Sequence, residues 1–255
     1  MVTISTAQRG FTLIELSIAL VIISLLIGGV LTGQSLIQSS ELQSVITDEG
    51  KFVTAVNVFD QKYNALPGDM TNATSFWGTD SACPNTPYNT TSKQATCNGD
   101  GNGSVDGNYE SFRFWQQLAN AGLIRGSYTG AAGQGASWEA DIGLNVPASR
   151  IANSGYLCVY FGAVSGDPNL FDGNYGHVCF FGAGWALNWP LGPAITAREA
   201  YGLDQKVDDG QPASGKVMGF KSSFAPGCTT ANDASARYAV TVLGVKCNLA
   251  FTNVF

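Results

Sequence analysis

The first hydrophobic block of the chain runs without a break from Phe11 to Leu31. It reads FTLIELSIALVIISLLIGGVL, with no proline and a single charged residue, Glu15. About 20 apolar residues at ~1.5 Å each are enough to cross the ~30 Å hydrocarbon core of a bilayer. The pattern therefore predicts a transmembrane helix over about residues 11–33, with one carboxylate at membrane depth.

The helical pattern continues beyond the apolar block. Apolar residues recur every three or four positions, as they do along one face of an α-helix. They are Leu36, Ile37, Leu42, Val45, Ile46, Phe52, Val53, Val56, Phe59 and Tyr63. Pro67 and Gly68 then end any helix. We predict one helix from Phe11 to about Asn64, whose second half packs against a globular head.

Two shorter helices are predicted in the remainder of the chain. Residues 108–123 form an amphipathic segment with Asn108 as N-cap, and residues 195–210 form another that begins at Thr196 and ends at Gly210. The buried stripe of the first is Phe112, Trp115, Leu118 and Ala119. The acidic residues of the second are expected on a solvated face: Glu199, Asp204, Asp208 and Asp209.

Strand patterns lie between and after these helices. Residues 155–163 and 176–183 are rich in β-branched and aromatic residues, and Pro and Gly turn signals separate them. They predict an antiparallel hairpin, with His177 at a strand end. Residues 236–247 predict a further strand. The expected class is α+β, with an antiparallel sheet in the head.

The length and the charge of the chain narrow the class of protein. The chain has 255 residues and a net charge of −6, with only 13 Lys plus Arg and no basic cluster. This balance argues against nucleic acid as a partner. The chain after the long helix is large enough to bury a core of its own. We expect one extracytoplasmic globular head over residues 65–255.

The cysteines point to an oxidising compartment. All six follow the apolar block, at positions Cys83, Cys97, Cys158, Cys179, Cys228 and Cys247. An even count confined to the soluble part indicates disulfides formed outside the cytoplasm. Six cysteines allow fifteen connectivities, of which pairing between sequence neighbours is the simplest. With His177 as the one histidine and no C-x-x-C, a Cys/His zinc site is not expected.

The N-terminus differs from an ordinary secretory signal. The polar leader MVTISTAQRG precedes an apolar run that is longer than a signal-peptide core, and no A-x-A-like site closes that run. A plain single-span anchor with Arg9 on the cytoplasmic side would satisfy the positive-inside rule. Such an anchor does not explain why the chain keeps Glu15 at membrane depth.

The stretch from Gly10 to Leu16, GFTLIEL, resembles the N-terminus of the type IV pilin and type II secretion pseudopilin superfamily. The resemblance covers the first fifty or so residues. It implies that a prepilin peptidase cleaves between Gly10 and Phe11 and methylates the new amine of Phe11. Residues 1–10 would then be a cleaved leader, and residues 11–64 would form the long helix. The resemblance implies a pilin-like fold in which disulfides cross-link the antiparallel sheet of the head.

The resemblance also implies a role for Glu15. Cleavage creates a positive amine at Phe11, four residues before Glu15, and in a filament the amine of one subunit can meet the carboxylate of its neighbour. Each charge then has a partner in an apolar core, where an isolated charge is costly. Filament assembly is therefore assigned to Glu15.

The implied partners are the prepilin peptidase, other pilin or pseudopilin subunits, the membrane, and an inner-membrane assembly platform with its ATPase. The implied location is the bacterial inner membrane with the head in the periplasm, followed by a cell-surface pilus or a periplasmic pseudopilus. The sequence leaves open which filament is built and whether the subunit is major or minor. The alternative function is a membrane-tethered extracytoplasmic binding domain that never polymerises.

One loop has the residues of a calcium site. Oxygen-bearing side chains alternate with Gly in CNGDGNGSVDGNYE, as in the opening of a D-x-[DN]-x-[DN]-G loop. The candidate ligands are Asn98, Asp100, Asn102, Asp106 and Glu110. Glu110 falls one position late for that pattern, and the same residues also form simple tight turns. Calcium is the one cofactor that the sequence suggests, and none is required.

Catalytic motifs are missing from the sequence. It contains no G-x-S-x-G, no H-E-x-x-H and no phosphate-binding Gly loop, and one histidine leaves little scope for an imidazole base. No pair of carboxylates stands out for glycosidase chemistry. We therefore expect a structural protein and no enzyme.

Overall fold

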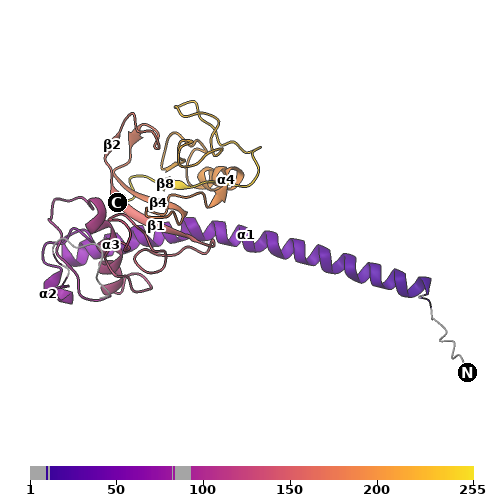
Figure 1. Ribbon diagram of the computed structural model, residues 1–255, viewed down its shortest axis with the longest axis horizontal. Coiled ribbons are helices and arrows are strands. Elements are labelled where there is room, and N and C mark those ends of the chain that lie inside the picture. Colours follow the sequence, from indigo (N-terminus) through magenta and orange to yellow (C-terminus); the bar gives the residue numbers. More distant parts are fainter. Residues whose placement is uncertain (1–9, 11, 82, 84–92) are drawn as a thin grey trace, which may run out of the picture. The chain divides into compact units, whose positions relative to one another are not determined.

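A computed structural model describes residues 10, 12–81, 83 and 93–255 of the chain, apart from the side chain of Asn108. The chain divides into two compact units, Met1–Glu41 and Leu42–Phe255. The second unit therefore contains the C-terminal part of the long helix together with the head. Figure 1 gives the order of the helices and strands along the chain.

The long helix α1 runs from Leu13 to Tyr63. It ends because Asn64 adopts a left-handed conformation with φ 52°, while its N–H still bonds to the Asp60 carbonyl at 2.7 Å. Asn is one of the few residues that tolerate this conformation after a helix. The predicted helix over residues 11–64 is confirmed for the part of it that the structure describes.

Within the second unit, α1 packs through its apolar face. The ring of Phe52 makes edge contacts with Trp115 and Tyr156, at centroid distances of 4.8 and 5.2 Å. Val56 and Phe59 on the same face are fully buried. The predicted contact between the second half of the helix and the head is confirmed.

Two short helices precede the main sheet, namely α2 (Thr74–Trp77) and α3 (Gly107–Asn120). The N-cap of α3 is Asp106, so the prediction of Asn108 was wrong. The helix starts earlier because the Glu110 carboxylate accepts the Asp106 N–H at 2.8 Å, which holds the chain in the first turn. From Glu110 to Leu118 the helix is buried on all sides, so the predicted amphipathic pattern is wrong there. Phe112, Trp115 and Leu118 are buried as predicted, whereas Ala119 is half-buried.

The main sheet has four strands in the order β1-β4-β8-β6, and all of its pairs are antiparallel. These strands are β1 (Ser154–Tyr160), β4 (His177–Ala183), β8 (Leu249–Phe251) and β6 (Val217–Met218). Two small two-stranded sheets pair β2 (Ala163–Val164) with β3 (Gly173–Asn174), and β5 (Ile195–Thr196) with β7 (Val245–Cys247). The predicted hairpin is the β1–β4 pair.

The predicted strand over residues 236–247 is wrong for most of its length, since only Val245–Cys247 is a strand. The N–H groups of Val240 and Val242 bond to carbonyls two and three residues earlier, so they form turns instead of a ladder. Leu243 is 89% exposed. The β-branched composition predicted a strand, but before Val245 the pairing in the described chain is limited to one isolated antiparallel bridge between Tyr238 and Thr229.

The last helix, α4, spans Ala197–Val207. Thr196 and Glu199 form a reciprocal capping box, in which each side chain accepts the backbone N–H of the other residue. The predicted cap at Thr196 is confirmed. Glu199 was expected only as part of a solvated face, but it is also the second half of the cap.

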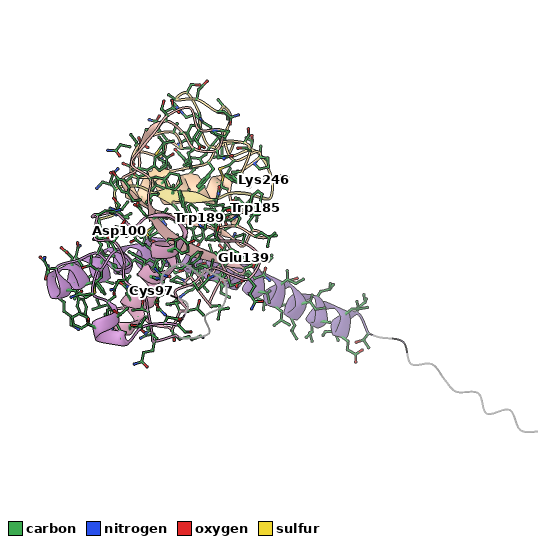
Figure 2. The ribbon with its side chains drawn as sticks, turned by 60° about the vertical axis from the view of Figure 1, so that its left-hand side comes forward. Cys97, Asp100, Glu139, Trp185, Trp189 and Lys246 are labelled. Atoms are coloured by element: carbon green, nitrogen blue, oxygen red, sulfur yellow. A yellow bond between two sulfur atoms is a disulfide. The ribbon has the colours of Figure 1, made fainter. Side chains whose placement is uncertain are left out.

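Three disulfides join Cys83 to Cys97, Cys158 to Cys179, and Cys228 to Cys247. Each links sequence neighbours, which is the simplest of the pairings that the sequence allows. Cys158 and Cys179 are also register partners in β1 and β4, so the second bridge crosses the hairpin as predicted. Figure 2 shows the side chains of the chain as sticks and labels Cys97 of the first bridge.

Candidate functional site

The N-terminal unit exposes a long apolar helix surface. Every Leu, Ile and Val from Leu13 to Leu31 is at least half exposed, from 52% at Ile22 to 90% at Leu13. Continuous apolar surface of this size needs lipid or protein to cover it. By length and composition, α1 is the one helix in the described chain that can cross a membrane, with a mean hydropathy of 2.5 in its most apolar window.

The described part of this surface begins with a helix cap. The backbone N–H and the hydroxyl of Thr12 both donate to Glu15 Oε2 at 2.8 Å, and the Glu15 N–H donates to Thr12 Oγ1 at 3.3 Å. This is a capping box, and the sequence T-L-I-E carries its S/T-x-x-E signature. The sequence reasoning assigned Glu15 to assembly and missed this local role.

The predicted processing site lies at the edge of the described chain. Gly10 is exposed, while Phe11 and the leader before Gly10 lie outside the described residues. Cleavage between Gly10 and Phe11, and methylation of Phe11, therefore stay predictions that rest on sequence.

In the second unit, three carboxylates from separate segments converge. Asp69 follows α1, Asp100 lies in the Gly-rich loop, and Glu110 stands in the first turn of α3; one oxygen of each lies within 4.8 Å of the others. Asp69 and Glu110 are buried, and Asp100 is exposed. Of the predicted calcium ligands, the structure thus brings Asp100 and Glu110 together and adds Asp69.

Backbone amides already surround two of these carboxylates. Asp69 accepts N–H groups from Gly101, Asn102 and Gly103 at 2.6 to 3.1 Å, so the Gly-rich loop is wrapped around this side chain. Glu110 accepts N–H groups from Asp100 and Asp106 at 3.1 and 2.8 Å. The cluster therefore organises the loop whether or not a cation binds there.

The other predicted ligands take different roles. Asn98 Oδ1 accepts the Thr74 N–H at 2.9 Å and so holds the start of α2. The side-chain amide of Asn102 donates to Asp100 at 3.1 Å and to Asp106 at 2.8 Å. Asp69 lies about thirty positions before this loop, so no local spacing rule could reveal it. Calcium binding at this cluster stays a prediction.

Burial raises the pKa of Glu110 to about 7, although hydrogen bonds from the Asp106 and Asp100 amides lower it. Burial also raises the pKa of Asp69, against the lowering effect of its amide donors. Two buried carboxylates this close favour one shared proton or a neutralising cation.

Two other predicted residues have structural partners. His177 begins β4 as predicted, and its Nε2 accepts the Val105 N–H at 3.2 Å. Asp204, expected on a solvated face, is fully buried, so that prediction was wrong. It accepts the Tyr238 hydroxyl at 2.9 Å and the Gly210 N–H at 3.0 Å, because α4 turns this face toward the Tyr238 segment.

A family model described as a prokaryotic N-terminal methylation motif matches residues 5–31. The chain therefore carries the prepilin-type signal that is typical of the type IV pilin and pseudopilin superfamily. The match ends before the head begins. Searches of curated proteins and of solved structures gave no significant match.

Proposed function

We propose that this chain is a structural subunit of a type IV pilus or type II secretion filament, and that it polymerises through its N-terminal helix. The methylation motif over residues 5–31 and the exposed apolar surface from Leu13 to Leu31 carry the proposal together. The motif makes the chain a substrate for prepilin peptidase. Lipid covers the apolar surface from Leu13 to Leu31 before assembly, and the helices of neighbouring subunits cover it afterwards.

The geometry at the first turn of α1 supports the role of Glu15. Glu15 Oε2 accepts both Thr12 donors, whereas Oε1 makes no hydrogen bond with the described residues. The same carboxylate can therefore cap its own helix and still accept the Phe11 amine of a neighbour. In lipid, the Glu15 carboxylate and the Phe11 amine are each costly as isolated charges. In the filament each of the two charges has the other as its partner, so the pair sets the axial register of subunits.

The partners and location follow from this proposal. Before assembly, the subunit is anchored in the bacterial inner membrane with its head in the periplasm. An assembly platform with its cytoplasmic ATPase then extracts it into a filament of pilin or pseudopilin subunits. The size of the head favours a minor or specialised subunit. The role is structural, and no catalytic step is assigned to the head.

The test is an intact mass of the membrane-extracted protein, followed by fractionation of sheared surface fibres. We expect the mass of residues 11–255 plus one methyl group, and the protein in the fibre fraction or in a periplasmic filament. The matched control is Gly10→Val, which should retain the leader and stay in the membrane. A native chain that keeps residues 1–10 contradicts the proposal and supports the membrane-tethered binding domain.

A further inference from the structure

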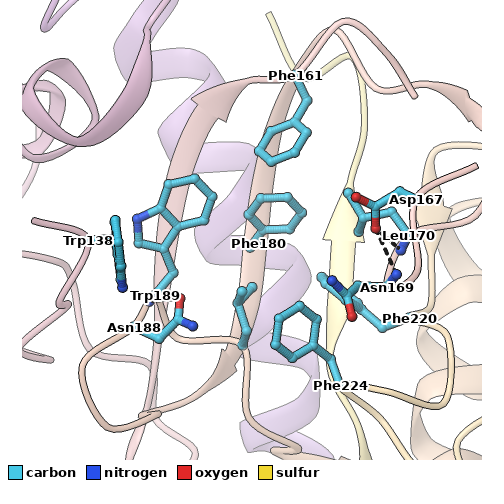
Figure 3. Close-up of a pocket in the computed structure, with 11 residues that line it drawn as sticks. Trp138, Phe161, Asp167, Asn169, Leu170, Phe180, Asn188, Trp189, Phe220 and Phe224 are labelled. Carbon is cyan, nitrogen blue, oxygen red and sulfur yellow. Dashed lines mark hydrogen bonds between the residues drawn. The ribbon is translucent and has the colours of Figure 1, made fainter. Parts of the chain in front are cut away.

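An aromatic pocket opens on the head, away from every residue assigned above. Its volume is about 380 Å³, within the range typical of small-molecule sites. Its walls come from four segments that are distant in the sequence, around residues 138, 161–170, 180–191 and 220–224. All of them belong to the second unit. Figure 3 shows the pocket from close by.

Phe180 of β4 is the centre of the aromatic wall. Its ring stacks with Trp189 at 6.1 Å between centroids and makes edge contacts with Phe161 at 5.5 Å and Phe220 at 5.6 Å. Phe180 and Phe220 are 1% exposed, whereas Trp138 is 47% exposed. The pocket thus has a fixed apolar floor and one exposed indole at its rim.

Polar groups stand on both sides of these rings. In Figure 3, Asn188 lies beside Trp138 and Trp189 on one side, and Asp167 and Asn169 lie on the other. The indole N–H of Trp189 is buried and meets no acceptor in the described part of the chain. In Figure 3 this nitrogen points toward Trp138 and away from Phe180, so the indole contributes its apolar ring to the pocket wall.

Hydrogen bonds to their oxygens fix the orientation of the Asn169 and Asn188 side-chain amides. Asn188 Oδ1 accepts the backbone N–H of Trp189 at 2.8 Å, and Asn169 Oδ1 accepts the Ser223 hydroxyl. Within the described chain, the Nδ2 groups of both residues are left with no acceptor. Asp167 Oδ1 accepts the N–H groups of Asn169 and Leu170 at 2.7 and 2.8 Å, while its Oδ2 accepts none there.

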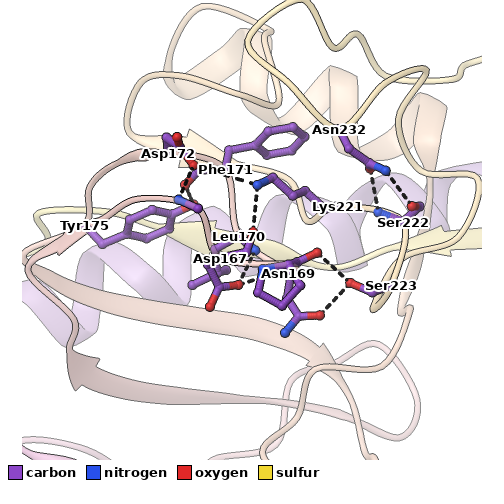
Figure 4. A network of polar contacts seen from close by, with 12 residues as sticks. Asp167, Asn169, Leu170, Phe171, Asp172, Tyr175, Lys221, Ser222, Ser223 and Asn232 are labelled. Atoms are coloured by element: carbon purple, nitrogen blue, oxygen red, sulfur yellow. Dashed lines mark hydrogen bonds and ion pairs between the residues drawn. The ribbon is translucent and has the colours of Figure 1, made fainter.

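The loop that carries Asp167 and Asn169 is held in place by neighbouring residues (Figure 4). The Lys221 ammonium donates to the Asp167 carbonyl at 2.7 Å, and the Lys221 N–H donates to the Asn169 carbonyl at 2.8 Å. The Ser223 hydroxyl reaches the Pro168 carbonyl at 2.9 Å. A loop fixed in this way loses little conformational entropy when a ligand binds.

We propose that this pocket binds a neutral saccharide through one pyranose ring. The C–H face of a pyranose packs against aromatic rings, and its hydroxyls both donate and accept. The side-chain amides of Asn169 and Asn188 supply donors, and Asp167 supplies an acceptor. A pyranose therefore uses both the ring faces and this mixed set of polar groups.

Other ligand classes fit the pocket less well. A purely apolar ligand would desolvate the Asp167 carboxylate and the two amides without replacing their hydrogen bonds. A cation would suit the rings and Asp167, but it brings no acceptor for the two amide donors. An anion would meet the Asp167 carboxylate, while the Lys221 ammonium already donates to the Asp167 carbonyl and lies 3.8 Å from Asp172.

The proposal does not depend on filament assembly, because every lining residue lies between Trp138 and Phe224. A chain that is never processed would still bind the saccharide. Failure of the glycan test therefore leaves the filament proposal intact, and failure of processing leaves the pocket proposal intact.

The experiment uses the full chain in a zwitterionic detergent without a sugar headgroup. Methyl glycosides of glucose, galactose, mannose and N-acetylglucosamine are titrated by calorimetry, with choline and N-acetylphenylalanine amide as comparison probes. We expect at least one glycoside to bind and to outcompete both comparison probes. Trp138→Ala should weaken that binding by about threefold to tenfold, which is the value of one aromatic contact.

Two further variants separate binding from folding. Asn169→Asp keeps the Oδ1 that accepts the Ser223 hydroxyl but loses the amide donor, and should weaken binding several-fold. Phe76→Ala removes an aromatic ring that is also exposed, at 55%, but lies outside the pocket, and should leave binding unchanged. The proposal is overturned if no glycoside binds, if Trp138→Ala and Asn169→Asp both bind as the native chain does, or if a comparison probe binds more tightly.

Discussion

Thr12 and Glu15 are hydrogen-bonded to each other at the first turn of α1. The Thr12 backbone nitrogen and the Thr12 hydroxyl oxygen each lie 2.8 Å from Glu15 Oε2. The carboxylate therefore has two separable properties, its hydrogen-bonding shape and its charge. The first stabilises the helix start within one chain. The second is the property that the proposed pairing between subunits requires.

Glu15→Gln tests the charge alone, because Gln also serves at this position of a capping box. We expect normal insertion and processing but a loss of assembly of tenfold or more, measured as subunit in the sheared-fibre fraction. Thr12→Val is the matched control, since it removes the hydroxyl and leaves the carboxylate. Its filaments should form. If Glu15→Gln assembles as well as the native chain, the charge pairing is wrong.

Gly68→Ala should destabilise the second unit strongly. Gly68 has φ +89°, and a Cβ there would lie 2.5 Å from the Glu110 carbonyl oxygen. We expect a loss of about 2–4 kcal/mol in the free energy of unfolding, measured by urea denaturation. Gly143→Ala is the control, because Gly143 has φ +85° but nothing within 4 Å of its Cβ position. It should cost about 1 kcal/mol. Equal losses would show that the contact with Glu110 is unimportant.

The Cys158–Cys179 bridge should stabilise the β1–β4 hairpin, because both cysteines are fully buried register partners. Replacing both by Ala should lower the free energy of unfolding by about 3 kcal/mol, as expected for a closed loop of this length. The measurement is chemical denaturation, with the native chain compared at equal pH. A loss below about 1 kcal/mol would mean that the strand pairing alone specifies the hairpin.

Asp204 should make stability depend on pH. Burial raises its pKa to about 7 from an ordinary value of 3.8, although the Tyr238 hydroxyl and the Gly210 amide lower it. Between these two values the folded chain holds a proton that the unfolded chain has lost. Stability should therefore fall as pH rises from about 4 to 7, and level off above pH 7.

The variant for this prediction is Asp204→Asn, which keeps one oxygen acceptor and cannot ionise. It should reduce the fall in the free energy of unfolding between pH 4.5 and pH 7.5 by about 2–4 kcal/mol. Part of the slope should remain, because burial also raises the pKa of Glu49 and of Glu110 to about 7. A slope equal to that of the native chain would mean that Asp204 is ionised in the folded state.

The calcium prediction is tested at Asp69, the residue that the structure added to the predicted set. Calorimetric titration of chelator-treated protein with CaCl₂ should show binding that Asp69→Asn abolishes. Asp141→Asn is the control, since Asp141 belongs to neither group of acidic residues that lie close enough to hold a metal ion, and should leave the titration unchanged. No heat of binding to the native chain would contradict the prediction and leave the cluster as a loop-organising network.

The sequence by itself determined the features that depend on near neighbours. The period of apolar residues defines α1 to within two residues at its end, and the GFTLIEL stretch alone identifies the methylation motif. The β1–β4 hairpin and its Cys158–Cys179 bridge were also predictable, because two strands of clear pattern flank a connection, residues 161–176, that is rich in turn residues. In each case the deciding interactions lie within a few turns or one hairpin.

Tertiary structure alone decided the features that distant segments build together. Asp69 reaches the Gly-rich loop, and Asp204 is buried against Tyr238, because the packing of separate elements brings them there. The same holds for residues 240–244, which form turns and no strand despite their strand-like composition, and for the pocket around Phe180. Hydropathy and spacing describe neighbours along the chain, whereas burial and hydrogen-bond partners here depend on contacts between segments tens of residues apart.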